Sequence, residues 1–336
     1  MKRNIAAFGG DAHRVTVMGE SAGANMALAL LASPASEGLF QDAIVQSSTD
    51  GAHTVPLAQA ERQTYAQALD EIGCGEGLGL LACLRAAPVQ AFQRMTVKPT
   101  LVQDSVALPL DPFEAFRQGR FNRVPVLIGG NARENYLFTA RMESDVLKRG
   151  LTRDDLDGQF KANFGAKADI VGAQYPLGAY VNAATLIGSA LTDRRFACMA
   201  NLARAGLSQY VPVFGHQLYI ADPVQQQSLA PRGDLPNVSY HTTDLGCVFD
   251  NDNAARPLRA YHAALSQMIV GYCSAFAATG DPNGAEERAG RIVWPHFTKE
   301  TPVVFSLSDA PKPIGSFVAE HKCAFWEQSG LVATTW

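Results

Sequence analysis

The sequence predicts an α/β fold in which a mostly parallel sheet is flanked by helices. Short β-rich runs alternate along the chain with long stretches of helix-favouring residues, a pattern typical of parallel strands joined by helical crossovers. Hydrophobic residues make up 47% of the 336 residues and charged residues 18%. That composition supplies a sizeable core and is too apolar for a disordered chain.

The predicted elements follow one another along the chain. A β-rich run at residues 14–18 stops at Gly19, and residues 22–32 are rich in Ala, Leu and Met, which favour a helix. Further strands are predicted at residues 42–47, 124–130, 211–219 and 302–307, and further helices at residues 56–72 and 258–278. Gly73 ends the first of these helices, and Gly280 with Pro282 ends the second. Residues 286–291 are the most polar insertion and are predicted to be a surface loop.

Charge and hydropathy exclude several classes of function. Lys and Arg number 28 and Asp and Glu number 32, a formal net charge of −4 that provides no basic patch for nucleic acid or anionic lipid. The longest clean apolar run, residues 26–32, is far shorter than the roughly 20 residues that span a bilayer, so no transmembrane segment is predicted. Residues 1–11 lack the apolar segment and cleavage site of a signal peptide, and are typical of the last turn of a helix followed by a Gly-Gly-Asp turn.

The strongest local signal is a Gly-x-Ser-x-Gly motif at residues 19–23, between a predicted strand and a predicted helix. A sharp turn there strains the backbone of Ser21 and lifts its hydroxyl off the sheet. Gly19 and Gly23 lack a Cβ and permit close approach of neighbouring elements, and the N–H of Ala22 at the helix start is placed to face an oxyanion. The simpler alternative is a strand–helix turn built from small residues.

A reactive serine needs a base, and the base needs a group that orients it. The order expected for a serine at such a turn is Ser, then Asp or Glu, then His. Of seven histidines, His241 stands out because it lies in a loop just before an apolar stretch. Glu134 follows the end of a predicted strand, where catalytic groups of parallel sheets collect. The other six histidines are predicted to be surface or packed residues, and spacing alone does not select these two candidates.

These segments resemble the type B carboxylesterases and lipases, the family that includes the cholinesterases. Residues 4–11 (NIAAFGGD) and 14–24 (RVTVMGESAGA) are similar to the serine signature of that family. Further resemblance lies at 43–47 (AIVQS), 83–85 (CLR), 121–129 (FNRVPVLIG) with 131 and 134, 192–198, 241–245, and 323–326 (CAFW). The likeness therefore runs from residue 4 to residue 326.

The resemblance implies an α/β-hydrolase fold and a serine carboxylesterase or lipase. It assigns Ser21 as the nucleophile, Glu134 as the acid and His241 as the base, with Ala22 as one donor of the oxyanion hole. The substrate implied is a small-molecule or lipid ester. The sequence departs from the family pattern mainly at turns near the site and on the pocket wall, which affects the expected substrate more than the triad; these positions are Ser48, Asp104, Ser105, Asn135 and Cys247.

The resemblance also implies how four of the six cysteines pair. Cys74 is expected to bond to Cys83 and Cys198 to Cys323, whereas Cys247 and Cys273 are expected to be buried thiols. Two structural disulfides are typical of an exported protein, so a secreted or periplasmic location is expected for the full-length protein. The alternative is that all six cysteines are reduced, because residues 1–11 do not form a signal peptide.

Members of the family carry a Gly-Gly loop well before the serine, which supplies further oxyanion donors, together with strands that precede the serine strand. Neither is found in residues 1–20. We therefore expect residues 1–336 to be the C-terminal part of a single α/β-hydrolase domain, truncated at its N-terminal side. The strand at 14–18 would then lie at an open edge. As a chain on its own it is expected to be poorly soluble or inactive.

Two other functions are compatible with the sequence. One is a noncatalytic, cholinesterase-like interaction or adhesion domain, which a retained serine, acid and histidine disfavours. The other is a peptidase or thioesterase that uses the same three residues. The sequence contains no metal-spaced Cys/His set and no phosphate-binding loop, so neither a metal nor a cofactor is expected. No pattern indicates the oligomeric state.

Overall fold

The computed structural model describes residues 2–97, 100–221, 235–249, 260–284 and 291–332. A six-stranded sheet lies at its centre, in the order β1-β2-β5-β6-β7-β8. Its strands are β1 (Thr16–Glu20), β2 (Asp42–Gln46), β5 (Val126–Asn131), β6 (Val213–Leu218), β7 (Val304–Leu307) and β8 (Lys312–Ile314). The first five strands pair in parallel and β8 pairs antiparallel with β7, which confirms the predicted mostly parallel sheet. Within the described residues β1 pairs with β2 alone.

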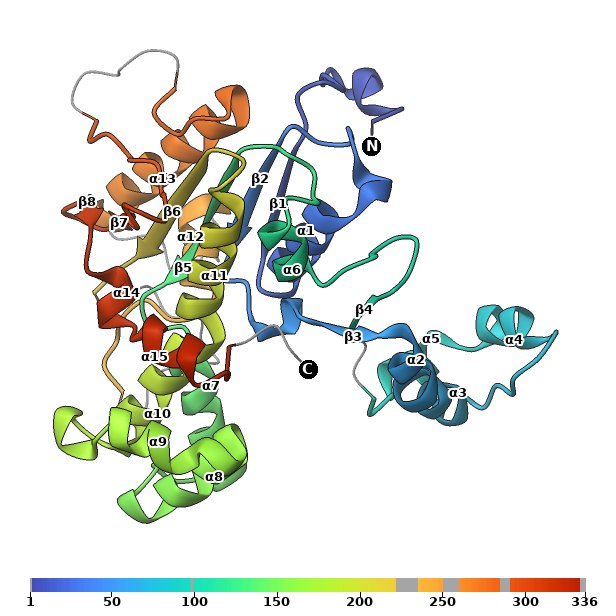
Figure 1. Ribbon diagram of the computed structural model, residues 1–336, viewed down its shortest axis with the longest axis horizontal. Helices are drawn as coiled ribbons and strands as arrows, with labels where there is room; N and C mark the ends of the chain where they lie inside the picture. Colours follow the sequence, from blue (N-terminus) through green and yellow to red (C-terminus); the bar gives the residue numbers. More distant parts are fainter. Residues whose placement is uncertain (1, 98–99, 222–234, 250–259, 285–290, 333–336) are drawn as a thin grey trace.

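Helices connect the strands and surround the sheet (Figure 1). The helices outside the arm described below are α1 (Ala22–Ala32), α6 (Pro112–Arg117), α7 (Tyr136–Arg141), α8 (Leu156–Phe164), α9 (Ala168–Gln174), α10 (Ala183–Thr192), α11 (Cys198–Leu207), α12 (Thr243–Phe249), α13 (Ala260–Thr279), α14 (Phe317–Glu320) and α15 (Cys323–Gln328). Helix α1 has the bounds predicted from composition, and the predicted strands shift by no more than two or three residues at either end. The predicted start of α13 at residue 258 and, apart from residue 291, the predicted loop at 286–291 lie outside the described residues.

The alternation of side chains along the strands divides the core into two layers. In β2, Ala43 and Val45 belong to a cluster with buried residues of α1, α6 and α11, whereas Ile44 belongs to a cluster with buried residues of α13. The same alternation holds in β5, where Ile128 faces the first cluster and Leu127 the second. Buried on both faces, these strands have apolar residues in near-continuous runs, as a covered parallel sheet requires.

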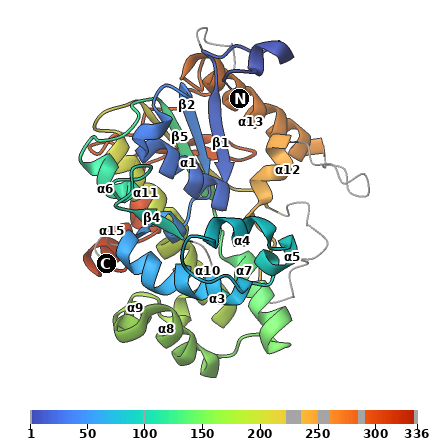
Figure 2. The same cartoon turned by 90° about the vertical axis from the view of Figure 1, so that its right-hand side faces the viewer.

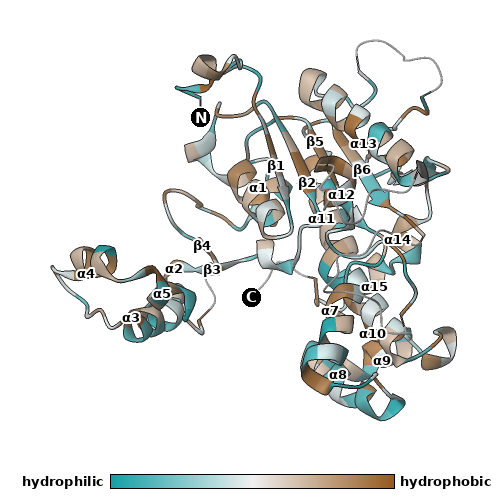
Figure 3. Cartoon of the chain, turned by 180° about the vertical axis from the view of Figure 1, so that it is seen from behind, coloured by the Kyte–Doolittle hydropathy of each residue, from teal (hydrophilic) through white to brown (hydrophobic). Residues whose placement is uncertain are grey.

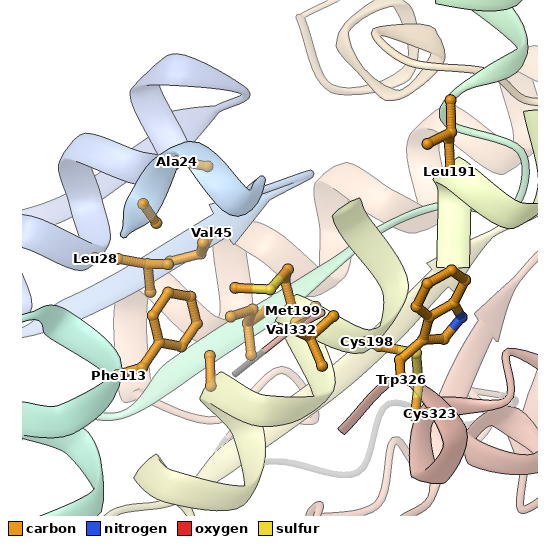
Figure 4. Close-up of a cluster of buried hydrophobic side chains, with 14 of the residues drawn as sticks. Ala24, Leu28, Val45, Phe113, Leu191, Cys198, Met199, Cys323, Trp326 and Val332 are labelled. Atoms are coloured by element: carbon orange, nitrogen blue, oxygen red, sulfur yellow. A yellow bond between two sulfur atoms is a disulfide. The ribbon is translucent and has the colours of Figure 1, made fainter. Parts of the chain in front are cut away.

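The larger cluster reaches from the start of the sheet to the C-terminal helices. Figure 4 shows Leu28 of α1 and Phe113 of α6 on one side, and Trp326 of α15 beside the Cys198–Cys323 disulfide on the other. Hydropathy changes from the apolar strands in the middle to hydrophilic positions on outer helices such as α8 (Figure 3). None of the described helices is both long enough and apolar enough to traverse a bilayer.

Residues between β3 (Thr54–Pro56) and β4 (Leu101–Gln103) form an arm that projects from the body of the molecule (Figure 1) and is seen end-on in Figure 2. It contains α2 (Leu57–Ala60), α3 (Ala66–Ile72), α4 (Leu80–Ala86) and α5 (Val89–Gln93). The single helix predicted at 56–72 is present as α2 and α3 joined by a π-helical turn at Glu61–Tyr65, and it ends at Gly73 with φ 81° as predicted. The two short strands of the arm are missed by the sequence reading.

Candidate active site

Ser21 lies at a sharp turn between a strand and a helix. Strand β1 ends at Glu20 and α1 begins at Ala22, and Ser21 between them has φ 56° and ψ −117°, a strained conformation for a residue with a side chain. Its backbone N–H donates to the carbonyl oxygen of Gln46 at 3.0 Å, which ties the turn to the end of β2. The Ser21 side chain is left only partly buried, and the N–H groups of the first turn of α1 begin beside it.

The two glycines of the motif have different roles. A Cβ at Gly19 would lie 2.2 Å from the carbonyl oxygen of Gly23, so only glycine lets β1 approach α1 this closely. A Cβ at Gly23 would meet no atom within 4 Å. The prediction that both glycines permit close approach therefore holds for Gly19 and is wrong for Gly23. The nearest atoms to Gly19 belong to the backbone of Gly23, and a residue of any type at position 23 would supply the same atoms.

Glu134 is buried in the loop that follows β5, at the carboxyl end of the sheet. Its Oε1 accepts hydrogen bonds from the Ser47 hydroxyl at 2.6 Å and from the backbone N–H of Asn131 at 2.5 Å. A Cβ at Gly130 would lie 2.5 Å from the same oxygen, so the glycine makes room for the carboxylate. These contacts hold one oxygen of Glu134 in place and leave Oε2 for another partner.

That partner is His241, in the loop just before α12. Its Nδ1 lies 2.7 Å from Glu134 Oε2, and its Nε2 lies 2.8 Å from Ser21 Oγ. The rings of Phe138 and Phe196 each lie with their centroid 5.2 Å from that of the imidazole. The backbone N–H of His241 also donates to the Glu134 carbonyl oxygen at 3.3 Å. Three residues that are far apart in the chain thus form one continuous line of hydrogen bonds.

The remaining histidines that the structure describes lie elsewhere. His53 Nδ1 lies 3.2 Å from Asp111 Oδ2 and His321 Nδ1 lies 2.6 Å from Asp193 Oδ1, so each imidazole is hydrogen-bonded to a different carboxylate from that of Glu134. The ring of His216 is buried beside Trp294, and His13 is exposed. These positions agree with the sequence reading of such histidines as packed or surface residues.

Two acidic groups to which the sequence analysis assigns no role lie near His241. Glu20 Oε1 is 3.4 Å from His241 Nε2, and burial raises the pKa of Glu20 to about 7 against the opposing charge of His241. Burial, then the charge of Glu134, raises the pKa of Asp244 to about 6. Burial by itself would lower the pKa of His241. The hydrogen bond and charge of Glu134, with the charges of Glu20 and Asp244, outweigh it and raise the pKa of the imidazole.

Ser47 and Asn131 also belong to the site, although the sequence analysis assigned them no role. Ser47 directly follows β2 and has φ 55°, which turns the chain so that its hydroxyl reaches Glu134. Asn131 ends β5 and donates to Asp244 through its side chain at 3.1 Å. The signal that points to both is their position, because polar residues at the carboxyl ends of adjacent parallel strands converge at one edge of the sheet.

Both disulfides that the family resemblance implies are present. Cys74 bonds to Cys83 within the arm, and Cys198 at the start of α11 bonds to Cys323 at the start of α15. Cys247 and Cys273 are free thiols. Cys247 is buried as expected, whereas Cys273 is only half-buried, on the side of α13 that lies at the margin of the core. Burial, then the charge of Asp244, raises the pKa of both thiols to about 12, so both stay protonated at neutral pH.

Comparison with known proteins agrees with the geometry of the fold. The sequence model described as the carboxylesterase family matches residues 1–326. The chain is 30% identical over 322 residues to the para-nitrobenzyl esterase of Bacillus subtilis, covering 90% of the chain and 60% of that protein. It is also 26% identical to an acetylcholinesterase of Leptinotarsa decemlineata, over 97% of the chain and 55% of that protein.

Solved structures titled PNB esterase show the same architecture. One of them aligns with a TM-score of 0.73 and 26% sequence identity, and the alignment covers 96% of the chain and 65% of that structure. A thermophilic PNB esterase aligns with the same TM-score at 25% identity. The chain therefore spans about 60% of the length of the curated relative from Bacillus and about two thirds of these structures.

Proposed function

The chain belongs to the carboxylesterase family, and from that premise we propose that its site hydrolyses carboxylic esters through an acyl-enzyme formed on Ser21. The observation that carries the proposal is the line of hydrogen bonds from Ser21 Oγ to His241 Nε2 and from His241 Nδ1 to Glu134 Oε2, at 2.8 and 2.7 Å. A nucleophile, a base and an orienting acid within hydrogen-bond reach of one another are the arrangement that activates a serine.

In the first half of the reaction, Ser21 Oγ attacks the ester carbonyl carbon while its proton passes to His241 Nε2. The imidazolium that forms lies against the buried carboxylate of Glu134, which stabilises the charge and keeps the proton of Nδ1 directed at Oε2. The carbonyl oxygen becomes an oxyanion. The N–H of Ala22, first residue of α1, is the donor we assign to it, aided by the positive end of the helix.

The tetrahedral intermediate then collapses. His241 returns its proton to the leaving alkoxide, the ester C–O bond breaks, and the acyl group remains bonded to Ser21 Oγ. In the second half, water attacks the acyl carbonyl and passes its proton to the same nitrogen of His241. The carboxylic acid leaves, and the proton on His241 Nε2 returns to Ser21 Oγ. Both halves use one base in the same position, which is why a fixed imidazole is required.

We assign small-molecule or lipid carboxylic esters as the substrate class. The para-nitrobenzyl esterase of Bacillus subtilis is named for an ester of that kind and supports the assignment. The two disulfides support an oxidising compartment, so we also propose that the protein is exported.

The test separates an activated serine from complete turnover. Purified protein is incubated with a fluorophosphonate probe, and hydrolysis of short p-nitrophenyl esters is measured in parallel. We expect labelling confined to Ser21, and loss of both labelling and hydrolysis in Ser21→Ala. Ser33→Ala is the matched control, because Ser33 follows the far end of α1 and its hydroxyl donates to the carbonyl oxygen of Ala107. A folded wild-type protein that resists the probe would refute the assignment of Ser21 as nucleophile.

A further inference from the structure

A small internal cavity has Glu134 in its wall. It lies between the carboxyl end of β5, strand β6, α11 and α14, and most of its lining residues are buried. The lining includes Asn131, Glu134, Arg204 and His216, and the space has room for about one water molecule. Glu134 belongs to the proposed chemistry described above, whereas Arg204 and His216 have no part in it.

Arg204 is the most unusual residue of the lining. It is 0% exposed, and none of its three guanidinium nitrogens has a hydrogen-bond partner among the described residues. The ring centroids of Phe317 and Phe297 lie 4.6 and 5.3 Å from its guanidinium carbon. These rings make cation–π contacts with Arg204 but offer its N–H groups no hydrogen-bond acceptor. Burial lowers the pKa of Arg204 to about 9, so the side chain is still charged at neutral pH. A buried guanidinium of this kind requires an acceptor.

Two other polar atoms of the lining also lack a partner within the described part of the chain. They are His216 Nδ1 and Asn131 Oδ1. Burial, then the charge of Arg204, lowers the pKa of His216 to about 3, so its ring is neutral. Both oxygens of Glu134 are already engaged, one by Ser47 and Asn131 and the other by His241, so the carboxylate does not pair directly with Arg204.

A guest in this cavity has to accept from the guanidinium and donate to an amide oxygen. Water does both and fits the volume, whereas a small anion only accepts and would lie in the same cavity wall as the Glu134 carboxylate. We propose that one water molecule is bound in this cavity, that it links Arg204 to Asn131, and that Arg204 thereby acts as a positioning residue for Glu134 and His241. The proposal rests on the proposed function only in naming His241 as the base.

The charge of Arg204 has a definite effect on the pair formed by His241 and Glu134. Binding a proton changes the charge of this pair from −1 to 0, and a nearby cation favours the −1 form. Arg204 therefore lowers the pKa of the pair, and its removal raises that pKa whichever residue holds the proton. Arg204 and Glu134 line the same small cavity without direct contact, so we expect a shift of the order of one pH unit.

The other titratable groups around the pair are kept in all Arg204 variants. The charge of Arg204 also lowers the pKa of His216, but burial is the larger cause and keeps that ring neutral without it. Glu20 on β1 and Asp244 on α12 face His241, His216 on β6 faces Arg204, and the Cys247 thiol lies near Asp244. The acids act in the opposite direction to Arg204, since they raise the pKa of His241. A shift seen on replacing Arg204 is thus attributable to its own charge.

The experiment follows the His241 Nδ1 proton by one-dimensional proton NMR, in the far-downfield region where a hydrogen bond to a carboxylate places it. Titration of this signal gives the pKa of the pair without any turnover. The variants are Arg204→Met and Arg204→Gln, which remove the charge, and Arg204→Lys, which keeps it. Arg194→Met is the matched control, because Arg194 is a half-buried arginine that precedes α11 and does not line the cavity.

We expect the pKa to rise by about one unit in the two neutral variants and to stay near the wild-type value in Arg204→Lys and Arg194→Met. In these two neutral variants, the acid limb of the pH profile of kcat/KM for ester hydrolysis should move to higher pH by the same amount. A signal that titrates alike in all variants overturns the role of Arg204, even in an active enzyme. A shifted signal in a protein that hydrolyses no ester leaves the inference standing and refutes the proposed function instead.

A high-resolution crystal structure of the wild-type protein tests the water directly, and decides the matter if the neutral variants do not fold. Density for one water within hydrogen-bond distance of Arg204 and Asn131 supports the proposal. An empty cavity overturns it. So does an anomalous peak in the cavity after bromide soaking, because the guest would then be an anion rather than a water.

Discussion

Replacing Glu20 by glutamine is the sharpest test of how charge sets the strength of the base. The substitution keeps the shape of the side chain and removes a carboxylate whose Oε1 lies 3.4 Å from His241 Nε2. The ionised carboxylate favours the imidazolium and raises the pKa of His241. Glu20→Gln should therefore lower the pKa of His241, so that activity persists to lower pH.

The distance gives the size of the effect. Two unit charges 3.4 Å apart interact by about 1.2 kcal/mol in water and by about 5 kcal/mol at an effective dielectric constant of 20. The lower figure corresponds to a pKa shift of about one unit. Because the pKa of Glu20 is itself about 7, the carboxylate is only partly ionised where His241 titrates, and the two groups titrate together. We expect a net shift of about 0.5–1 unit.

The assay is the pH dependence of kcat/KM for a p-nitrophenyl ester, with Glu61→Gln on the exposed arm as the control. The acid limb should move down in Glu20→Gln and stay in place in Glu61→Gln. The plateau should fall by up to about tenfold, because the imidazolium formed in the transition state loses a neighbouring anion. An acid limb that moves up or does not move would show that Glu20 is not ionised beside His241, and the reasoning would fail.

Three further outcomes are expected. Gly19→Ala should cost about 1–3 kcal/mol and most of the activity, because its Cβ would lie 2.2 Å from a backbone oxygen, whereas Gly23→Ala meets nothing and should be near neutral in urea unfolding. Ser47→Ala removes a 2.6 Å hydrogen bond to the Glu134 carboxylate and should lower kcat by about tenfold or more with KM little changed, as steady-state kinetics would show. Cys198→Ser with Cys323→Ser opens a loop of 125 residues and should destabilise the fold by about 2–5 kcal/mol, so an unchanged melting temperature would contradict a structural role.

The part of the site that sequence predicts well is the part determined by local geometry. The turn at Ser21 needs the glycine at position 19, a strand before the serine and a helix after it. Each of these three features can be recognised from a few neighbouring residues. The bounds of α1 follow from helix-favouring residues, and the stop at Gly73 follows from a positive φ. Chain order, strand ends and family resemblance indicate Glu134 and His241, and none of these signals depends on contacts between distant residues.

Helix α10 escapes prediction although its polar residues Thr185, Ser189 and Thr192 recur at helical spacing. Every residue of α10 is buried, so its polar face carries only small hydroxyl side chains and no charged residue that would mark a solvent-exposed face. Its N-cap is Asn182 paired with Thr185 instead of the more recognisable Ser or Thr followed by Glu. Strands β3 and β4 are three residues each, too short for a period of two to be visible.

The electrostatic setting of the base escapes sequence reasoning for a different reason. Glu134, Glu20 and Asp244 raise the pKa of His241, while burial acts in the opposite direction. The working pKa of the imidazole is a difference between these opposing contributions, each set by burial and by distance. A motif can specify that an acid, a base and a serine are present, because each is a single residue type at an expected place in the chain order. The folded chain then brings the three side chains within hydrogen-bond distance of one another. It does not specify which nearby charge dominates, since a change of a few ångströms or of the surrounding dielectric alters each contribution several-fold.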